Sequence, residues 1–154
     1  MPTWCFKFIG IFGKTISRGH MLDPQTKIFL KFIPTKNLEE IVNIDIPRIR
    51  SSYELRANFI STVAKPVTSV SYEDFRINQS RLNIRKYSPV KINTSKSILY
   101  FHGGGYAFGS IKTHHELLMY YSSYLGAEIY SLDYSLSPEN QFPAALDDAF
   151  ESYK

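Results

Sequence analysis

Apolar and polar positions along the chain predict helices first and strands afterwards. Asp45 and Pro47 are suited to the start of a helix, and Pro66 ends the region that follows. Between them, apolar residues recur at helical spacing, namely Ile46, Ile49, Tyr53, Ala57 and Ile60. Earlier in the chain, Asp23 and Pro24 open a shorter helical stretch in the same way. The pattern thus places two helices ahead of residue 66.

Beyond Pro66 the spacing of apolar residues changes to that of strands. Two segments rich in β-branched and aromatic residues, 67–77 and 81–87, flank the polar stretch 78–80, which predicts a hairpin. In the second segment apolar and polar residues alternate, so one face of that strand should meet water. The run at 98–101 shows no alternation and predicts a strand buried on both faces.

The rest of the chain alternates helix and strand. A helix is expected over 114–125 and should end at Gly126, with an apolar side made of Leu117, Leu118, Tyr121 and Leu125. Residues 127–132 predict a strand, and a last helix begins near Pro143. Such alternation builds parallel strands with helices on both faces, so we expect an α/β fold. The last helical pattern is still running at Lys154, with no cap, which indicates a chain that has been cut.

These patterns divide the chain into a leader (1–21), a helical segment (22–66) and a sheet-building part (67–154). Residues 4–13 of the leader are mostly apolar, but they are about half as long as a membrane-spanning helix, and no cleavage site marks a secretory signal. A peripheral membrane anchor and a leader ahead of a second start at Met21 both fit. The single cysteine excludes a disulfide framework and a cysteine-based zinc site, and it fits a cytoplasmic location.

Composition and charge narrow the class of protein. Apolar residues make up 44% of the 154, which excludes a disordered chain and allows one ordinary domain. The net charge of +4 is unevenly distributed, because residues 1–100 hold 16 of the 18 Lys and Arg but only seven of the 14 acidic residues. These basic residues occur singly or in pairs, which is typical of a solvated surface, so no nucleic-acid partner is expected.

A glycine-rich loop, 102–110, follows the most apolar strand directly. Its three consecutive glycines, 103–105, expose backbone N–H groups with no side chains above them. Such a loop can direct amides at a developing negative charge, for example at the oxyanion of acyl transfer, where each lost donor can cost roughly 3–4 kcal/mol. A glycine turn needed only for close packing explains the loop equally well.

Two phosphate-binding motifs fit this loop poorly. Gly104 and Gly109 have the spacing of the first two P-loop glycines, but Ser110 stands where the P-loop lysine belongs. The dinucleotide-binding pattern also fails, because Phe108 occupies the position of its third glycine. Acyl chemistry is therefore favoured over phosphate binding.

Two sequence blocks together resemble a known family. HGGGYAFGS at 102–110 and DYSLSPENQFPAALDDAF at 133–150 are similar to the hormone-sensitive-lipase-type (fold-3) branch of the α/β-hydrolases. The similarity covers about residues 22–154 and implies the N-terminal half of such a protein. It implies an incomplete α/β-hydrolase sheet, about four N-terminal strands with flanking helices, preceded by a helical cap segment. The sheet order would be 1-2-4-3, which leaves strand 98–101 at an unprotected edge and the isolated chain prone to aggregation.

The resemblance also implies roles for residues of the loop. Gly104 and Gly105 would be oxyanion-hole donors, while His102 and Gly103 would shape the loop. Tyr106 and Phe108 could line the acyl pocket, and core packing explains each of them as well; the helices between residues 22 and 62 would cover that pocket.

The catalytic groups of a serine esterase are missing from this sequence. The fold requires a G-x-S-x-G elbow, then an acid and then a histidine, and no such pentapeptide occurs in the 154 residues. The resemblance thus implies a carboxylic-ester hydrolase segment that is inactive alone and uses no cofactor. It would act on a small acyl ester once a C-terminal half, or a partner chain, supplies serine, acid and histidine. A non-catalytic remnant and an anion-binding module are the alternatives.

Other polar residues of the second half are assigned structural roles. By resemblance, the acids Asp133, Glu139, Asp147 and Asp148 hold loops and helix ends, and Ser135 stands where an arginine is common. His114 and His115 are adjacent on a helix and point about 100° apart, which makes a shared metal ion unfavourable. No metal site is expected.

Overall fold

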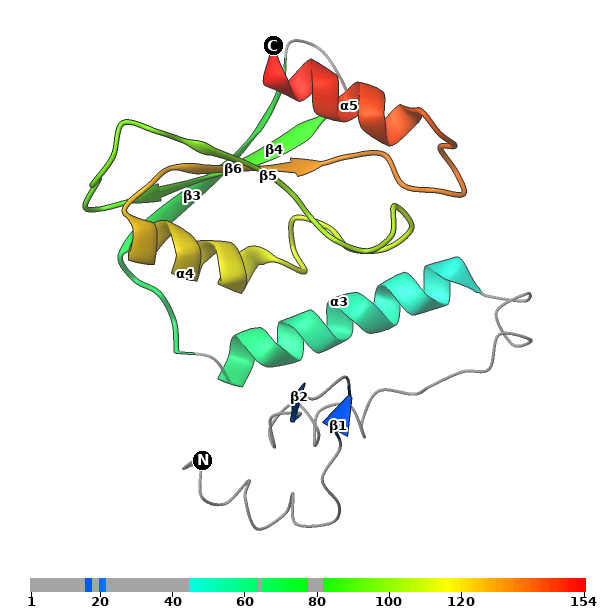
Figure 1. The fold of residues 1–154 in the computed structure, drawn as a ribbon, viewed down its shortest axis with the longest axis horizontal. Helices are drawn as coiled ribbons and strands as arrows, with labels where there is room; N and C mark the ends of the chain where they lie inside the picture. The colour runs from blue at the N-terminus through cyan, green and yellow to red at the C-terminus, as the bar shows by residue number, and fades with distance from the viewer. Residues whose placement is uncertain (1–15, 18–19, 22–44, 64, 78–81) are drawn as a thin grey trace. The chain divides into compact units, whose positions relative to one another are not determined.

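The computed structural model describes residues 16–17, 20–21, 45–63, 65–77 and 82–154 (Figure 1). The chain divides into two compact units, Met1–Ile44 and Asp45–Lys154. In the first unit, β1 (Ile16–Ser17) pairs antiparallel with β2 (His20–Met21). The helix predicted to open at Asp23 and the apolar residues 4–13 lie outside the described residues. Within the described ranges, no helix combines the length and the hydropathy needed to cross a bilayer.

The second unit is built on a four-stranded mixed sheet. Its strands are β3 (Val70–Arg76), β4 (Asn83–Pro89), β5 (Ile98–Phe101) and β6 (Ile129–Asp133). The spatial order is β3-β4-β6-β5, and β5 pairs parallel with β6 while the other pairs are antiparallel. This is the expected 1-2-4-3 order, so the predicted edge position of β5 is confirmed. The predicted hairpin between β3 and β4 is also confirmed, although its turn, 78–81, is not described.

Three helices accompany the sheet: α3 (Ile46–Val63), α4 (His115–Leu125) and α5 (Ala144–Tyr153). Their positions confirm the three helices predicted behind Asp45, near His114 and near Pro143. Asp45 caps α3 by accepting a hydrogen bond from the Arg48 amide at 3.1 Å. Gly126 ends α4 in a left-handed conformation, as its position in the sequence predicts. The predicted helical segment 22–66 is divided between the two units, because α3 groups with the sheet.

Two apolar clusters lie on opposite faces of the sheet. One packs α4 against the sheet and consists of Val70, Tyr87, Leu118, Met119 and Ile129. The other lies under α5, where Ala145 packs on it, and consists of Leu82, Ile84, Leu132 and Tyr134. In both β4 and β6, residues three positions apart point to opposite faces, so both strands contribute to both clusters. Helices thus cover both faces of the sheet, as predicted, and the expectation of one solvated face for 81–87 is wrong.

Two further predictions about burial are wrong. β5 is not buried on both faces, because Ile98 and Phe101 at its ends are 36% and 43% exposed at the sheet edge. The buried side of α4 is formed by Leu118, Met119 and Ser122, whereas the other predicted members are 40–44% exposed, namely Leu117, Tyr121 and Leu125. Apolar residues lie all around α4, so their spacing alone does not single out the face that meets the sheet.

Candidate functional site

The glycine-rich loop and the segment after β6 leave the sheet from the same edge. The register pairs Phe101 with Leu132, so the parallel strands β5 and β6 end at the same level. Residues 102–110 and 134–143 therefore lie beside each other although they are far apart in sequence. Two hydrogen bonds join them: the Tyr134 hydroxyl donates to the His102 carbonyl at 2.6 Å, and the Ser137 amide donates to the Tyr106 carbonyl at 2.8 Å.

His102 is buried at the base of the loop and acts on its own backbone. Its side chain is 3% exposed and stacks on the Tyr134 ring, with centroids 4.2 Å apart. Its Nδ1 lies 3.1 Å from the Gly103 carbonyl oxygen, which can only accept, so Nδ1 carries the proton. Burial lowers the pKa of His102 below its ordinary value, which favours the neutral ring. The protonated Nδ1 thus fixes the direction of the Gly103 carbonyl.

A tight turn follows, and two hydrogen bonds within it hold the Gly104 carbonyl. The amides of Ala107 and Phe108 donate to this oxygen at 3.1 and 3.0 Å. Gly104 has φ = 135°, and a Cβ there would overlap the backbone of Phe108, so only glycine fits. Gly109 has φ = 88°, and a Cβ there would overlap the Gly103 oxygen and the His102 ring. Both glycines are therefore required by the close approach of the loop to itself.

The held carbonyls determine where the amides of the loop point. In a planar trans peptide the C=O and the following N–H point in opposite directions. His102 binds the Gly103 oxygen, so the N–H of the same peptide unit, at Gly104, points away from His102. The turn binds the Gly104 oxygen, so the N–H of that peptide unit, at Gly105, points away from the turn. Among the described residues, neither amide has an acceptor. Gly104 is half-buried and Gly105 is exposed, so both N–H groups are accessible to a ligand.

A cavity of about 710 Å³ adjoins these amides. Its wall includes the three glycines 103–105, and its apolar lining comes from the end of β5, the loop after β6 and the start of α5, for example Phe101, Tyr134, Phe142 and Leu146. Tyr106, with φ = 60°, also lines the cavity, whereas Phe108 does not. A concave apolar wall with a few convergent polar groups is typical of a small-molecule site.

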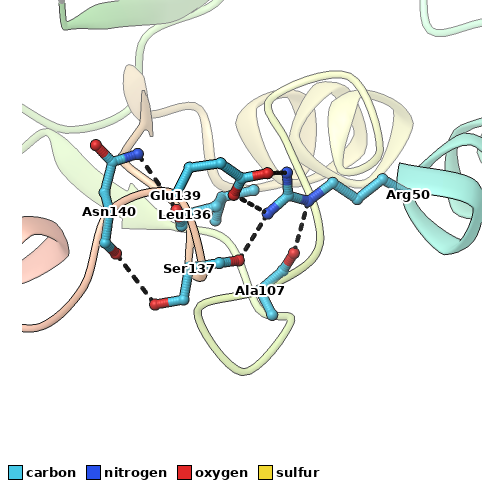
Figure 2. Close-up of polar contacts among 6 residues, drawn as sticks. All are labelled: Arg50, Ala107, Leu136, Ser137, Glu139 and Asn140. Atoms are coloured by element: carbon cyan, nitrogen blue, oxygen red, sulfur yellow. Dashed lines mark hydrogen bonds and ion pairs between the residues drawn. The ribbon is translucent and has the colours of Figure 1, made fainter. Parts of the chain in front are cut away.

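An arginine from α3 joins the two loops (Figure 2). Arg50 Nε donates to the Ala107 carbonyl at 2.8 Å, and Nη2 donates to the Ser137 carbonyl at 2.7 Å. Both Nη atoms also bind the Glu139 carboxylate, each at 2.9 Å. Arg50 beside Glu139 holds the pKa of that carboxyl below its ordinary value. Among the described residues, all hydrogen bonds between α3 and residues 65–154 come from this guanidinium.

No pattern in the sequence indicated the role of Arg50. Its partners lie 57 to 89 residues further along the chain, so neither helical spacing nor a local motif could point to them. The acids behave as the resemblance implies in two cases, since Glu139 binds Arg50 and Asp148 accepts a hydrogen bond from the Ser135 amide at 2.7 Å. Ser135 thus keeps a contact with α5 through its backbone.

The two adjacent histidines have separate partners. His114 Nδ1 lies 3.0 Å from the Thr113 hydroxyl at the start of α4. His115 Nδ1 lies 3.2 Å from the Tyr87 hydroxyl, and burial lowers the pKa of His115. Within the described part of the chain, no three His, Cys, Asp or Glu side chains gather as metal ligands would.

Comparison with known proteins agrees with this geometry. Residues 98–154 match the family described as alpha/beta hydrolase fold. The arylesterase of Saccharolobus solfataricus is 30% identical over 132 residues, which cover 85% of this chain and 42% of the arylesterase. The hormone-sensitive lipase of Homo sapiens is 45% identical over 56 residues, or 36% of this chain and 5% of the lipase. The structure of a Pyrobaculum calidifontis esterase superposes with a TM-score of 0.68 at 26% identity, covering 85% of this chain and 41% of that one.

The four-stranded sheet and the glycine turn at its edge are thus part of an α/β-hydrolase fold. The chain belongs to the hormone-sensitive-lipase-type branch of this family. It spans less than half the length of the arylesterase and of the esterase to which it is similar.

Proposed function

We propose that this chain supplies the oxyanion hole of a carboxylic-ester hydrolase, with the amides of Gly104 and Gly105 as donors. The observation that supports this role is that both N–H groups point away from carbonyls held by the loop itself and, among the described residues, lack acceptors beside an apolar cavity. Donors fixed before the reaction stabilise the oxyanion without a reorganisation cost. His102 and Gly103 shape the loop, and Tyr106 forms part of the acyl pocket.

The nucleophile of this reaction comes from outside the 154 residues. No G-x-S-x-G occurs in the sequence. Among the described residues, Ser137 is the one serine that lines the cavity, and it donates its hydroxyl to the Asn140 carbonyl at 3.1 Å. His102 does not act as the base, because its Nε2, the ring nitrogen that carries no proton, is buried and contacts no hydroxyl among the described residues. A serine, an acid and a histidine must therefore be added for turnover.

The open edge of the sheet supports a partner that provides these groups. No described strand pairs with the outer side of β5, and this strand leads directly into the glycine turn. A strand added there lies about 4.8 Å from β5, so a nucleophile at its carboxyl end reaches the carbonyl carbon of an ester bound at the turn. The partner is thus a C-terminal half, or a separate chain, that carries serine, acid and histidine. The substrate is a small acyl ester.

Fusion to a nucleophile-bearing segment tests this function. The chain alone should show no serine-dependent hydrolysis of p-nitrophenyl acetate or butyrate. The chain fused to the part of the Saccharolobus solfataricus arylesterase beyond the matched region should hydrolyse these esters. In the fusion, Gly104→Ala should reduce kcat by about 10²–10³-fold, because its Cβ would overlap the Phe108 backbone and move the donors out of line, which costs as much as losing one of them. Gly103→Ala, where a Cβ would meet open space, serves as the matched control.

Two results contradict the proposal. Turnover by the 154 residues alone that a serine-directed sulfonyl fluoride abolishes would mean that the nucleophile lies within the chain. A folded fusion whose activity is unchanged by Gly104→Ala would mean that the glycine turn does not hold the oxyanion.

The same free amides favour one other candidate, an anion-binding module. Two convergent N–H groups bind a carboxylate or phosphate without any catalysis. Titration of the ¹⁵N-labelled chain with acetate and with inorganic phosphate distinguishes the two functions. Saturable shifts of the Gly104 and Gly105 amides, together with a folded but inactive fusion, favour the module.

A further inference from the structure

We propose that Arg50 is a positioning residue for this oxyanion hole, whose guanidinium orients and polarises the peptide units that aim the Gly105 N–H at the cavity. Its catalytic consequence rests on the function proposed above, while its effect on the loop does not. The guanidinium lies behind the turn and touches no residue of the cavity wall except Ser137, so it acts through the backbone.

The first step is a chain of two hydrogen bonds through peptide units. Arg50 Nε binds the Ala107 carbonyl, and the N–H of the same peptide unit, at Phe108, binds the Gly104 carbonyl at 3.0 Å. The Gly104 carbonyl in turn belongs to the peptide unit whose N–H is that of Gly105. Three groups thus stand in series, from the guanidinium through two peptide units to the Gly105 N–H at the cavity.

Charge at one end of such a series strengthens the donor at the other. Hydrogen bonds in a chain polarise one another, by an estimated 10–30% per bond in condensed phases. A cation on the Ala107 oxygen withdraws electron density from the Phe108 N–H, and the Phe108 N–H does the same to the Gly104 carbonyl. The Gly105 N–H therefore becomes a better donor to an oxyanion than an isolated amide.

A parallel path anchors the neighbouring peptide unit. The Ser137 amide binds the Tyr106 carbonyl, and the Ala107 amide of that peptide unit binds the Gly104 oxygen at 3.1 Å. Arg50 Nη2 binds the Ser137 carbonyl and so fixes the residue that makes this contact. The loop that contains Ser137 is itself closed by Asn140, whose side-chain amide donates to the Leu136 carbonyl at 3.3 Å (Figure 2) and whose backbone N–H donates to the same oxygen at 3.0 Å. Both peptide units that hold the Gly104 oxygen are thus secured by one guanidinium.

The contact requires the shape of arginine. Three nitrogens of a planar fork reach two carbonyls and one carboxylate at the same time. Glu139 binds two of them and fixes the rotation of the fork, although its own side chain is 52% exposed. A lysine ammonium, a single nitrogen, cannot span the Ala107 and Ser137 oxygens with the same geometry.

The test on the chain alone measures the loop amides by NMR. Arg50→Met should move the Gly105 amide proton upfield, because the polarising charge is lost, and should speed exchange of the Phe108 amide about tenfold or more. Arg50→Lys should recover only a small part of both changes. Arg48→Met is the matched control, because Arg48 lies on the same helix and forms hydrogen bonds to described residues through its backbone alone. Glu139→Gln should give an intermediate effect.

The kinetic arm uses the fusion described above. Arg50→Met should lower kcat about tenfold to a hundredfold and change KM less than about twofold, since the oxyanion forms only in the transition state. A role confined to stability would lower the melting temperature and leave kcat per folded molecule unchanged. Arg50→Lys, which keeps the charge and the helix, gives the same comparison if Arg50→Met does not fold.

Each result bears on one of the two proposals. An unchanged Gly105 resonance in folded Arg50→Lys, or unchanged kcat in a fusion that depends on Gly104, overturns the role of Arg50. A wild-type fusion that folds but shows no activity overturns the esterase function. If the Gly105 resonance of the chain alone still changes on substitution of Arg50, the structural coupling between Arg50 and the loop remains in place.

Discussion

The glycines of the loop are not equivalent, although they look alike in the sequence. Gly104 and Gly109 have left-handed backbone and lie against other backbone or ring atoms, whereas a Cβ at Gly103 meets nothing within 4 Å. The motif HGGG predicts the loop but not this difference, because the difference depends on Phe108 and His102 folding back onto it. The pattern of tolerated substitutions therefore follows from the turn geometry.

The first prediction compares two alanine substitutions in this loop. Gly109→Ala should lower the free energy of unfolding by more than about 2 kcal/mol, since it combines positive φ with overlap. Gly103→Ala should change the free energy of unfolding by less than about 0.5 kcal/mol. Urea unfolding monitored by fluorescence measures both, and equal losses would contradict the turn geometry.

The second prediction concerns His102, which is buried, and His115, which is half-buried. Burial lowers the pKa of His102 and of His115, which also faces the Arg85 guanidinium and the Tyr87 hydroxyl. Below about pH 7.5, where histidines of the unfolded chain begin to bind protons, the unfolded chain binds more protons at these sites than the folded chain. The stabilising contribution of these two histidines should therefore be complete above about pH 7.5, and the free energy of unfolding should fall as the pH is lowered below that value.

His115→Gln provides the control for this pH dependence. Glutamine keeps a hydrogen-bonding side chain towards Tyr87 but does not titrate, so the slope of unfolding free energy against pH should become shallower. Urea midpoints at a series of pH values measure the slope. A slope as steep as that of the wild type would mean that His115 does not contribute.

Helices and strands were largely predictable, and their exposed faces were not. The strand order, the hairpin and the three helices of the second unit agree with the spacing of apolar residues and with the resemblance. The buried face of α4 was wrong because its eleven residues carry apolar side chains on every side. His115 indicates the true face, since its contact with Tyr87 holds Leu118 and Met119 against the sheet.

The third prediction tests the corrected face of α4. Leu118 is fully buried against Ile129 and Tyr87, whereas Leu117 is 40% exposed. Leu118→Ala should reduce the free energy of unfolding by about 2–5 kcal/mol through loss of packing. Leu117→Ala, the same change one position away, should cost less than about 1 kcal/mol. Equal losses of unfolding free energy in the two variants, measured by urea unfolding, would support the orientation of α4 that was predicted from the sequence.

The two edges of the sheet differ in how they are protected. β3 presents charged side chains along its length, Glu73, Asp74 and Arg76, which discourage pairing with another chain. β5 consists of Ile, Leu, Tyr and Phe, and no described strand covers its outer side. This difference was predictable from the sequence once the strand order was known. It supports the expectation that the isolated chain associates through β5.

The fourth prediction follows from this asymmetry. Ile98→Lys should lower the apparent mass of the chain at high concentration, because a charge on an apolar edge opposes strand pairing. Val90→Lys, on a loop residue that is 84% exposed, should leave the apparent mass unchanged. Sedimentation velocity at several chain concentrations measures both variants. Association that persists unchanged in Ile98→Lys would place the contact elsewhere.

The strand at the open edge is also the strand that ends in the glycine turn. A polypeptide that pairs with β5 is therefore held at a fixed distance from the Gly105 amide by the sheet spacing itself. Under the proposed function, completing the sheet and completing the catalytic machinery are a single event. The rate of ester hydrolysis at saturating substrate then reports the fraction of chains that have found their missing strand, so this fold could be divided between two proteins to detect their association.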